Sequence, residues 1–434
     1  MGYQQAIDYL FGLQKFGIKL GLENISKLLS ALGDPHASLN CIHVAGSNGK
    51  GSTCAFLQSI FKHAGYETGL YTSPHLSDFT ERIRINDVFV TKLIVAELVA
   101  DIKRICQKKS LHTITFFEFT TALAFLYFSR NSVDPVIVET GMGGAFDATN
   151  CITPVLTVIT SISLEHQKYL GTTISAIASE KAGIIKPGIP LICGVRQKSV
   201  QNLFQNKCRE AGAKFIRLDN DFMTRKNTSG GFTFEGRGVL LPDLQSGLAG
   251  AHQLDNAAVA IAGAYFMKKI GYSIENSAIR NGIQNVRWPG RLELLRSSPA
   301  VIADGAHNPE GWRALKEFIT QRYSGKRRIL VLGIMQDKDI GRMLHILTEK
   351  ALAIIFCKPK IDRAAGYEIL KNFISFSEQK KVFWFENSID AYAKALCLAE
   401  KNDLICITGS LFLVGELREI ILKKTSKTSG RIAL

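Results

Sequence analysis

A glycine-rich stretch between an apolar run and a helical pattern most constrains what this chain can fold into. Residues 43–52 read HVAGSNGKGS and overlap the apolar run 41–45. Three of the residues 46–51 are glycines, whose backbone adopts turns that a Cβ forbids, so successive N–H groups can line one concavity. Apolar residues then recur at helical spacing from Ala55 to Ala64. The pattern predicts a phosphate-binding loop at a helix N-terminus, where the helix dipole favours anions.

The loop departs from the common phosphate-loop pattern at two positions. Val44 stands where that pattern has its first glycine, and Gly51 stands where it has a hydroxyl residue. A strand-to-helix turn that binds nothing is therefore the alternative interpretation. Lys50, which lies between two glycines, favours phosphate binding because a simple turn needs no such charge.

Alternating apolar and helical segments predict an α/β fold in two domains. A chain of 434 residues exceeds one ordinary core, and Pro289 and Gly290 mark the best linker, so we expect domains at 1–287 and 288–434. Strand patterns alternating with helices indicate doubly wound parallel sheets. Strands are expected at 41–45, 69–76, 134–139, 155–160 and 190–194, hairpins within 220–245, and further strands at 299–304, 328–332, 353–356 and 404–407.

Composition excludes several classes of protein. The apolar runs are too short to span a bilayer, and the N-terminus lacks the pattern of a secretion signal, so no membrane partner is expected. The nine cysteines are scattered and form no C-x-x-C pair, which favours the cytoplasm. A net charge of +15 predicts anionic partners. Because the basic clusters are short and no aromatic-basic interleaving accompanies them, small phosphate-bearing substrates are favoured over nucleic acid.

Three polar residues follow predicted strands. Ser73 and Glu139 lie at the ends of two of them, and His166 follows a third. Each alone is typical of a solvated loop or a hydrogen-bonded core residue. Parallel strands end at the same sheet edge, so together they predict a Mg²⁺ site beside the phosphate loop, with His166 the least typical ligand for that ion.

Ordered motifs along almost the whole chain resemble the folylpolyglutamate synthase and dihydrofolate synthase family of Mur-type ATP-dependent amide ligases. The resemblance rests on residues 43–52, 71–76, 81–85, 117–118, 139–150, 160–166, 180–184, 252–257, 290–291, 304–309, 337–339 and 409–410. It implies a P-loop-type doubly wound N-terminal domain and a smaller Rossmann-like C-terminal domain. It also implies ligation of L-glutamate to dihydropteroate or a reduced folate through an acyl phosphate, by a monomer that uses ATP and Mg²⁺.

The resemblance further implies a role for each matching residue. Lys50, Lys181 and His166 would be catalytic, with Lys181 carried as a carbamate, and Ser73, Glu139 and His166 would bind the metal. ATP would contact Ser47, Asn48, Gly49, Lys50, Gly51, Ser52, Asn256, Arg291 and Asp304. The pterin would contact Phe117, Glu118 and Asp147, and glutamate would contact His307 and Ser410. Since Gly51 lacks the usual hydroxyl, Ser73 is predicted to replace it on the metal.

Three positions depart from the family pattern, and two alternatives stay open. Ala145 replaces an arginine, Glu165 replaces the aspartate before the histidine, and Lys19 stands where bifunctional relatives have an aspartate. These departures bear on the choice of substrate. One alternative is a Mur-type ligase for another acid, which Phe117 and Glu118 disfavour. The other is a non-catalytic nucleotide-binding relative, which the intact Lys50 and Lys181 disfavour.

Overall fold

The computed structural model describes the chain except for residues 18, 20, 229, 237, 375–380 and 430–434. It divides into two compact units. The N-terminal unit comprises Met1–Gly247 and Gln253–Arg287, and the C-terminal unit comprises Leu248–His252 and Trp288–Leu434. The chain enters the C-terminal unit briefly at Leu248–His252 and passes into it finally at Trp288, beside the proline and glycine of the predicted linker.

The N-terminal unit is built on an eight-stranded sheet of order β4-β3-β2-β5-β1-β6-β7-β8. The strands from β2 to β8 in this order are parallel, whereas β3 and β4 add an antiparallel edge. This arrangement places β1 at the centre, so the loop that follows it lies mid-sheet. The strands are β1 (Cys41–Ala45), β2 (Gly69–Tyr71), β3 (Ile83–Ile85), β4 (Val88–Phe89), β5 (Val136–Glu139), β6 (Leu156–Ile159), β7 (Leu191–Cys193) and β8 (Phe215–Arg217).

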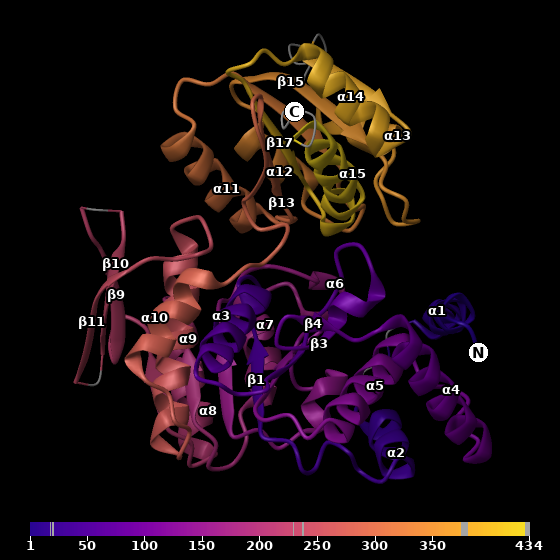
Figure 1. Ribbon diagram of the computed structural model, residues 1–434, viewed down its shortest axis with the longest axis vertical. Helices are drawn as coiled ribbons and strands as arrows, with labels where there is room; N and C mark the ends of the chain where they lie inside the picture. Colours follow the sequence, from indigo (N-terminus) through magenta and orange to yellow (C-terminus); the bar gives the residue numbers. More distant parts are fainter. Residues whose placement is uncertain (18, 20, 229, 237, 375–380, 430–434) are drawn as a thin grey trace. The chain divides into compact units, whose positions relative to one another are not determined.

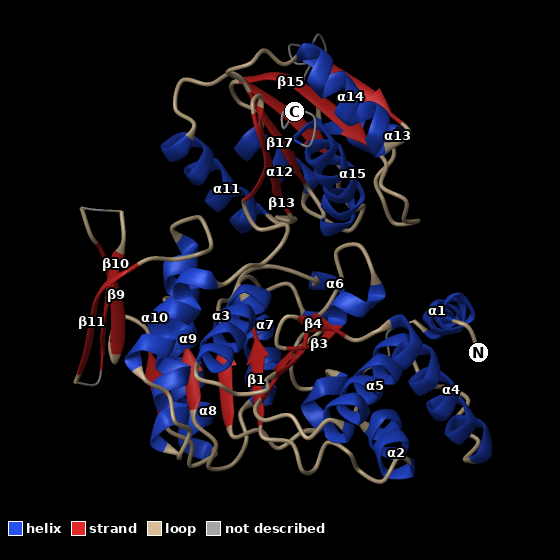
Figure 2. Cartoon of the chain, viewed as in Figure 1, coloured by secondary structure: helices blue, strands red, loops and turns tan. Residues whose placement is uncertain are grey.

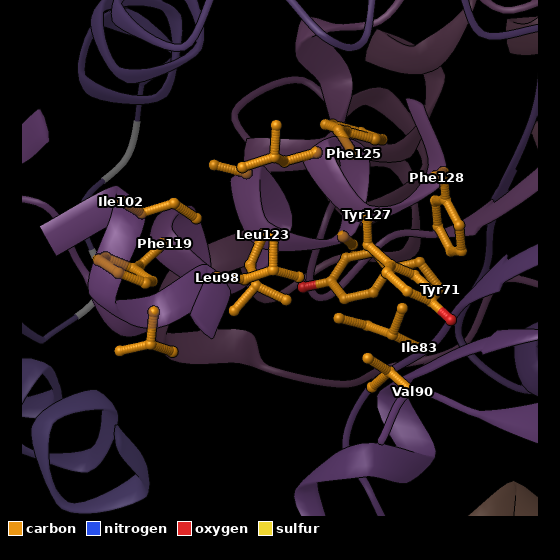
Figure 3. Close-up of a cluster of buried hydrophobic side chains, with 14 of the residues drawn as sticks. Tyr71, Ile83, Val90, Leu98, Ile102, Phe119, Leu123, Phe125, Tyr127 and Phe128 are labelled. Atoms are coloured by element: carbon orange, nitrogen blue, oxygen red, sulfur yellow. The ribbon is translucent and has the colours of Figure 1, made fainter. Parts of the chain in front are cut away.

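Helices cover both faces of this sheet, as the doubly wound prediction requires (Figure 2). On one face, Val136 and Val138 join a core with α1 (Tyr3–Gly12), α2 (Glu23–Ala31), α4 (Lys92–Lys108) and α5 (Phe116–Arg130). Figure 3 shows the rings of Phe119 and Phe125 in this core. The same face continues with α7 (Ile174–Lys181) and α8 (Lys198–Glu210). The opposite face carries α3 (Lys50–His63), α9 (His252–Lys269) and α10 (Asn276–Asn285).

A small antiparallel sheet of order β11-β10-β9 occupies the region where hairpins were predicted. Its strands are β9 (Phe222–Lys226), β10 (Phe232–Gly236) and β11 (Val239–Leu244). The Phe234 ring stacks on Tyr265 of α9 at a centroid distance of 6.2 Å, which fixes this sheet to the rest of the unit.

The C-terminal unit contains a six-stranded sheet of order β12-β13-β17-β14-β15-β16, in which β12 is antiparallel to β13 and the other pairs are parallel. Figure 1 labels β13, β15 and β17 of this sheet. Helices α11 and α12 cover one face of this sheet. Helix α14 packs against β14, β15 and β16, and α15 packs against β12, β13 and β17. The strands are β12 (Glu293–Ser297), β13 (Ala300–Asp304), β14 (Arg328–Leu332), β15 (Ala351–Cys357), β16 (Val382–Phe385) and β17 (Leu404–Thr408). The helices are α11 (Pro309–Arg322), α12 (Ile340–Leu347), α13 (Tyr367–Leu370), α14 (Ser388–Leu398) and α15 (Leu411–Ser429).

The structure differs from the predicted elements mainly at sheet edges. The strand expected at 69–76 ends at Tyr71, before the bend that contains Pro74. Strands β3, β4, β8, β12 and β16 were not predicted, since they are short or owe their pairing to a neighbouring strand. None of the described helices is long and apolar enough to cross a membrane.

Candidate active site

Two glycines allow the loop after β1 to pass close to its neighbours. Gly46 has φ +151° and Gly49 has φ +84°, values that L side chains rarely adopt. A Cβ on Gly46 would lie 1.9 Å from Thr160 Oγ1, and a Cβ on Gly49 would lie 2.3 Å from Asn256 Oδ1. Glycine is therefore required at both positions, by backbone conformation and by space.

Polar groups that follow β6 hold the loop in place. Ser47 donates its backbone N–H to the carbonyl of Ser161 at 2.8 Å, and its hydroxyl donates to the carbonyl of Ser163 at 3.1 Å. Asn48 donates its N–H to Ser161 Oγ at 2.9 Å, and its carbonyl accepts from Thr160 Oγ1 at 2.7 Å. The loop is thus organised by the protein itself, without a ligand.

The first turn of α9 meets the first turn of α3 at this loop. Gln253 Nε2 donates to Ser52 Oγ at 3.2 Å, and Asn256 Nδ2 donates to Gln253 Oε1 at 2.9 Å. Gly51 is buried in the first turn of α3. Segments about 200 residues apart in the sequence therefore meet where nucleotide contacts were predicted.

Two lysines converge on one backbone carbonyl. Lys50 Nζ donates to the carbonyl of Gly46 at 2.7 Å, and Lys181 Nζ donates to the same oxygen at 3.0 Å. Lys181 also lies 2.7 Å from Glu165 Oε1, and both of these side chains are buried. The loop therefore has two ammonium groups beside it, one of them paired with a carboxylate.

Burial and mutual charge shift the titration of this pair. Burial lowers the pKa of Lys181, and the nearby charge of Lys50 lowers it further, whereas Glu165 opposes both effects. Burial alone would raise the pKa of Glu165, but the charges of Lys181 and Lys50 outweigh it and lower that pKa to about 2. Glu165 is therefore ionised at neutral pH.

The predicted metal ligands lie at or just beyond strand ends. Ser73 N donates to Glu139 Oε2 at 3.2 Å, which places these two residues side by side after the parallel strands β2 and β5. His166 precedes the short helix α6 (Gln167–Leu170) with φ +44°, a strained conformation for a non-glycine residue. Among the described residues, no group of three or more His, Cys, Asp or Glu side chains could hold a metal. If Ser73 and Glu139 supplied two oxygen ligands, water and phosphate would complete the coordination, an arrangement that Mg²⁺ accepts.

The three residues predicted to touch the pterin lie near α5 and the loop after β5, and two of them have partners within the protein. The Phe117 ring packs so closely on Gly141 that a Cβ there would lie 2.4 Å from Phe117 Cζ. Glu118 closes a capping box, its Oε2 accepting from Thr115 N at 2.7 Å. Asp147 accepts from Met142 N at 2.8 Å and from Thr149 N at 3.0 Å, and burial raises its pKa. Glu118 therefore stabilises the start of α5, and Asp147 stabilises the loop after β5.

The C-terminal unit brings its predicted residues to the carboxyl edge of its own sheet. Asp304 ends β13, where its side chain accepts from Leu292 N and Ala306 N, each at 2.9 Å. His307 Nδ1 lies 2.9 Å from the carbonyl of Gly305, on the same loop.

Two more predicted residues lie on neighbouring segments of the C-terminal unit. Ser410 follows β17 and accepts from Leu413 N at 3.2 Å, at the start of α15. A Cβ on Gly305 would lie 3.5 Å from Arg291 Nη1, so this guanidinium also lies beside the loop after β13.

Both units match models of known protein domains. Residues 44–264 match the Mur ligase middle domain, and residues 290–411 match the Mur ligase glutamate ligase domain. The dihydrofolate synthase/folylpolyglutamate synthase of Bacillus subtilis (strain 168) is 37% identical over 426 residues, covering 96% of this chain and 98% of that protein. The chain belongs to the folylpolyglutamate synthase and dihydrofolate synthase family. It is an ATP-dependent acid–amino-acid ligase, as the motifs predicted.

Solved structures of this family share the fold of the whole chain. The Mycobacterium tuberculosis folylpolyglutamate synthase complexed with ADP has a TM-score of 0.88 at 31% identity, covering 96% of this chain and 99% of that one. The Escherichia coli protein FolC in complex with DHPP and ADP has a TM-score of 0.85 at 30% identity, covering 97% and 98%. These matches confirm the predicted family and the two-part α/β fold.

Two residues that support the loop after β1 and the first turn of α3 were not predicted from the sequence. Gln253 and Ser163 were given no role, yet they hold Ser52 and Ser47. The signal was present in the case of Gln253, since it is itself part of the motif at 252–257. Ser163 carried no such signal, because its role depends on how β6 lies beside β1.

Proposed function

We propose that this chain adds L-glutamate to the carboxylate of dihydropteroate, of a reduced folate, or of both, and that it uses ATP with Mg²⁺. The observation that carries this is the convergence of Lys50 and Lys181 on the Gly46 carbonyl, beside a glycine-required loop in a ligase of this family. Relatives complexed with ADP or with DHPP and ADP support these substrates.

The reaction needs positioning and charge neutralisation rather than a protein nucleophile. One oxygen of the substrate carboxylate attacks the γ-phosphorus of ATP, the bond to the β-phosphate oxygen breaks, and ADP leaves. The glutamate amine then attacks the carbonyl carbon of the acyl phosphate, inorganic phosphate leaves, and the nitrogen loses a proton. Lys50 would offset the charge that accumulates on the phosphate oxygens in the first step.

We assign the nucleotide phosphates to residues 47–52, with Asn256 beside them. Ser73 and Glu139 would hold Mg²⁺ together with His166, and the ion would supply a Lewis acid that neutralises phosphate charge. The adjacency of Ser73 and Glu139 supports this set, with Ser73 in the role that Gly51 cannot fill.

The C-terminal unit would supply Arg291 and Asp304 to the nucleotide and His307 and Ser410 to glutamate. This assignment is supported by their common location at the carboxyl edge of one parallel sheet, where ligands bind in such folds. Phe117, Glu118 and Asp147 would form the pterin wall, with only the Phe117 ring in direct contact, because the two carboxylates already have backbone partners.

The deciding experiment measures incorporation of labelled glutamate, with dihydropteroate and tetrahydrofolate offered separately. ATP-dependent incorporation with the first alone indicates a dihydrofolate synthase, with the second alone a folylpolyglutamate synthase, and with both a bifunctional enzyme. Omitting Mg²⁺ should abolish incorporation. No incorporation with either acceptor would overturn the proposal.

We further propose a cytoplasmic monomer. All nine cysteines are free thiols, which supports a reducing compartment. Light scattering coupled to size-exclusion chromatography would test the monomer, for which the expected mass is 47.8 kDa.

A further inference from the structure

Arg82 lies at the sheet edge that carries the proposed metal ligands. It ends the short helix η2 (Phe79–Arg82) directly before β3. Its carbonyl accepts from Thr72 N at 2.9 Å, and Tyr71 pairs with Ile83, so Arg82 sits beside the end of β2. Ser73 follows on the neighbouring chain segment.

The Arg82 guanidinium is hydrogen-bonded at its Nε side, and the residue is almost entirely buried. The residue is 7% exposed, and its Nε donates to His75 Nδ1 at 2.8 Å. Because guanidinium nitrogens only donate, Nδ1 of His75 is the acceptor and its ring hydrogen is on Nε2.

Two aromatic rings flank the guanidinium. Its central carbon lies 5.2 Å from the centroid of the Phe116 ring and 5.9 Å from that of Phe79. Phe116 begins α5 and directly precedes Phe117 of the proposed pterin wall. The guanidinium is therefore located between the segment that bears Ser73 and the segment assigned to the pterin.

Arg82 forms no direct ion pair with a carboxylate of the described residues, although the charges of Glu139 and Glu81 act on it from farther away. Within the described part of the chain, no carboxylate oxygen forms an ion pair with it inside 4.0 Å. Arg327, by contrast, binds both oxygens of Asp403, at 2.9 and 2.7 Å.

The nearest acidic candidate on its own helix is already engaged. Glu81 accepts from the backbone N–H groups of Leu76 at 2.6 Å and of Ser77 and Asp78 at 3.0 Å each. A buried guanidinium without a direct ion pair is costly to maintain, and an anion supplied from outside the chain would provide that pair.

We infer that Arg82 binds the carboxylate of the pterin substrate, with His75 fixing the orientation of the guanidinium. This inference rests on the proposed function and assigns its substrate carboxylate to a specific side chain. The two Nη groups would donate to the two carboxylate oxygens in the planar fork that guanidinium and carboxylate form. The charge of Arg82 would also reduce repulsion between that carboxylate and the ATP phosphates before the attack.

The test is equilibrium binding of dihydropteroate and of its neutral carboxamide, in the absence of ATP. The wild-type protein should bind the acid more tightly than the amide, by roughly 10-fold to 100-fold, as a charge-assisted fork implies. Arg82→Gln should bring this ratio close to one by weakening only the acid. Arg82→Lys keeps the charge without the fork and should give an intermediate ratio.

The acid-to-amide ratio separates binding from a purely structural role. Arg84→Gln is the matched control, because it removes another largely buried guanidinium two residues away, whose nearby acidic group is Asp87. It should lower the melting temperature and leave the ratio unchanged. His75→Gln should lower the ratio partially, since Arg82 keeps its charge and loses its support.

The outcomes distinguish this inference from the proposed function. If the wild-type protein binds dihydropteroate and Arg82→Gln retains the wild-type ratio, the inference is overturned and the ligase proposal stands. If Arg82→Gln does not fold, the test uses His75→Gln and Arg82→Lys instead. A wild-type ratio of acid affinity to amide affinity in both of these variants overturns the inference. Glutamate incorporation tests the ligase independently of these binding ratios.

Discussion

Lys181 Nζ and Glu165 Oε1 form an ion pair of 2.7 Å in which the two side chains are only 1% and 6% exposed. Glu165 stands where the family pattern has an aspartate, so this ion pair involves one of the positions at which the chain departs from that pattern. The additional methylene gives the carboxylate more reach toward the lysine. The pair lies directly beside the phosphate loop, because Lys181 also donates to Gly46.

Removing the carboxylate of this pair should destabilise the N-terminal unit. Glu165→Gln leaves a buried ammonium without its counter-charge, and the expected loss is about 3–5 kcal/mol in the free energy of unfolding. Denaturation in urea measures it. As control, Glu210→Gln breaks the exposed pair with Lys207 and should have almost no effect.

The same pair predicts an acid dependence of stability. The folded pKa of Glu165, about 2, lies below its ordinary value of 4.5, so its contribution is complete above pH 4.5 and disappears as pH falls toward 2. The difference in unfolding free energy between wild type and Glu165→Gln should shrink over that range. A difference that stays constant from pH 5 to pH 2 would contradict this assignment.

Glu165 should also oppose carbamylation of Lys181. The reaction with CO₂ needs a neutral amine, which burial favours and the charge of Glu165 disfavours, and the product would place a second anion beside the carboxylate. Glu165→Gln should therefore increase carbamate formation, measured by ¹³C NMR with labelled bicarbonate. Lys181→Arg, which cannot form the carbamate, identifies the signal.

Gly49 should be irreplaceable in ATP binding. Gly49→Ala introduces a Cβ at φ +84° and 2.3 Å from Asn256 Oδ1, so the loop or α9 must shift. We expect at least about 10-fold weaker ATP binding, measured by calorimetry, from a loss of 1–2 kcal/mol. Gly65→Ala is the matched control, with φ +91° and open space around its Cβ. Gly65→Ala should introduce similar backbone strain and leave the ATP affinity unchanged.

Lys50 should matter for the chemical step more than for folding. Its ammonium group donates to backbone carbonyls of its own loop, at Gly46 and Ser47. Lys50→Met should lower kcat/KM by about 10²–10³-fold in the incorporation assay, as expected for loss of a charge at the transition state. The melting temperature should change little. Lys423→Met, at an exposed site, should keep full activity.

Ala145 should affect how the pterin is handled. It lies against Gly183, where a Cβ would be 2.3 Å from Ala145 Cβ, and its N–H donates to the carbonyl of Glu180 at 2.9 Å. Ala145→Arg restores the guanidinium of the family pattern and should lower the KM for the pterin by about 10-fold, with the KM for ATP unchanged. Unchanged kinetics would refute a role for this position. Gln107→Arg adds the same charge on exposed α4 as control.

Much of the fold could be predicted because its signals are local. The strand Cys41–Ala45, the helix that follows its loop and the central strands of both sheets agree with the predicted segments. Each central strand is a short apolar run buried on both faces, so its own composition identifies it. Strands such as β3 and β8 carry no such run, and their pairing partners are what make them strands.

The sequence by itself determined the glycine-rich turn after the first strand, the central strands of both sheets and the family, because glycine spacing and apolar runs act over a few residues. Only the tertiary structure decided that Lys50 and Lys181 meet at one carbonyl, that Glu165 pairs with Lys181, and that Arg82 lies buried without a direct ion pair to any described carboxylate. These relationships join segments tens to hundreds of residues apart. The physical reason is that the charge balance of a buried group depends on its neighbours in space, which local sequence patterns do not encode.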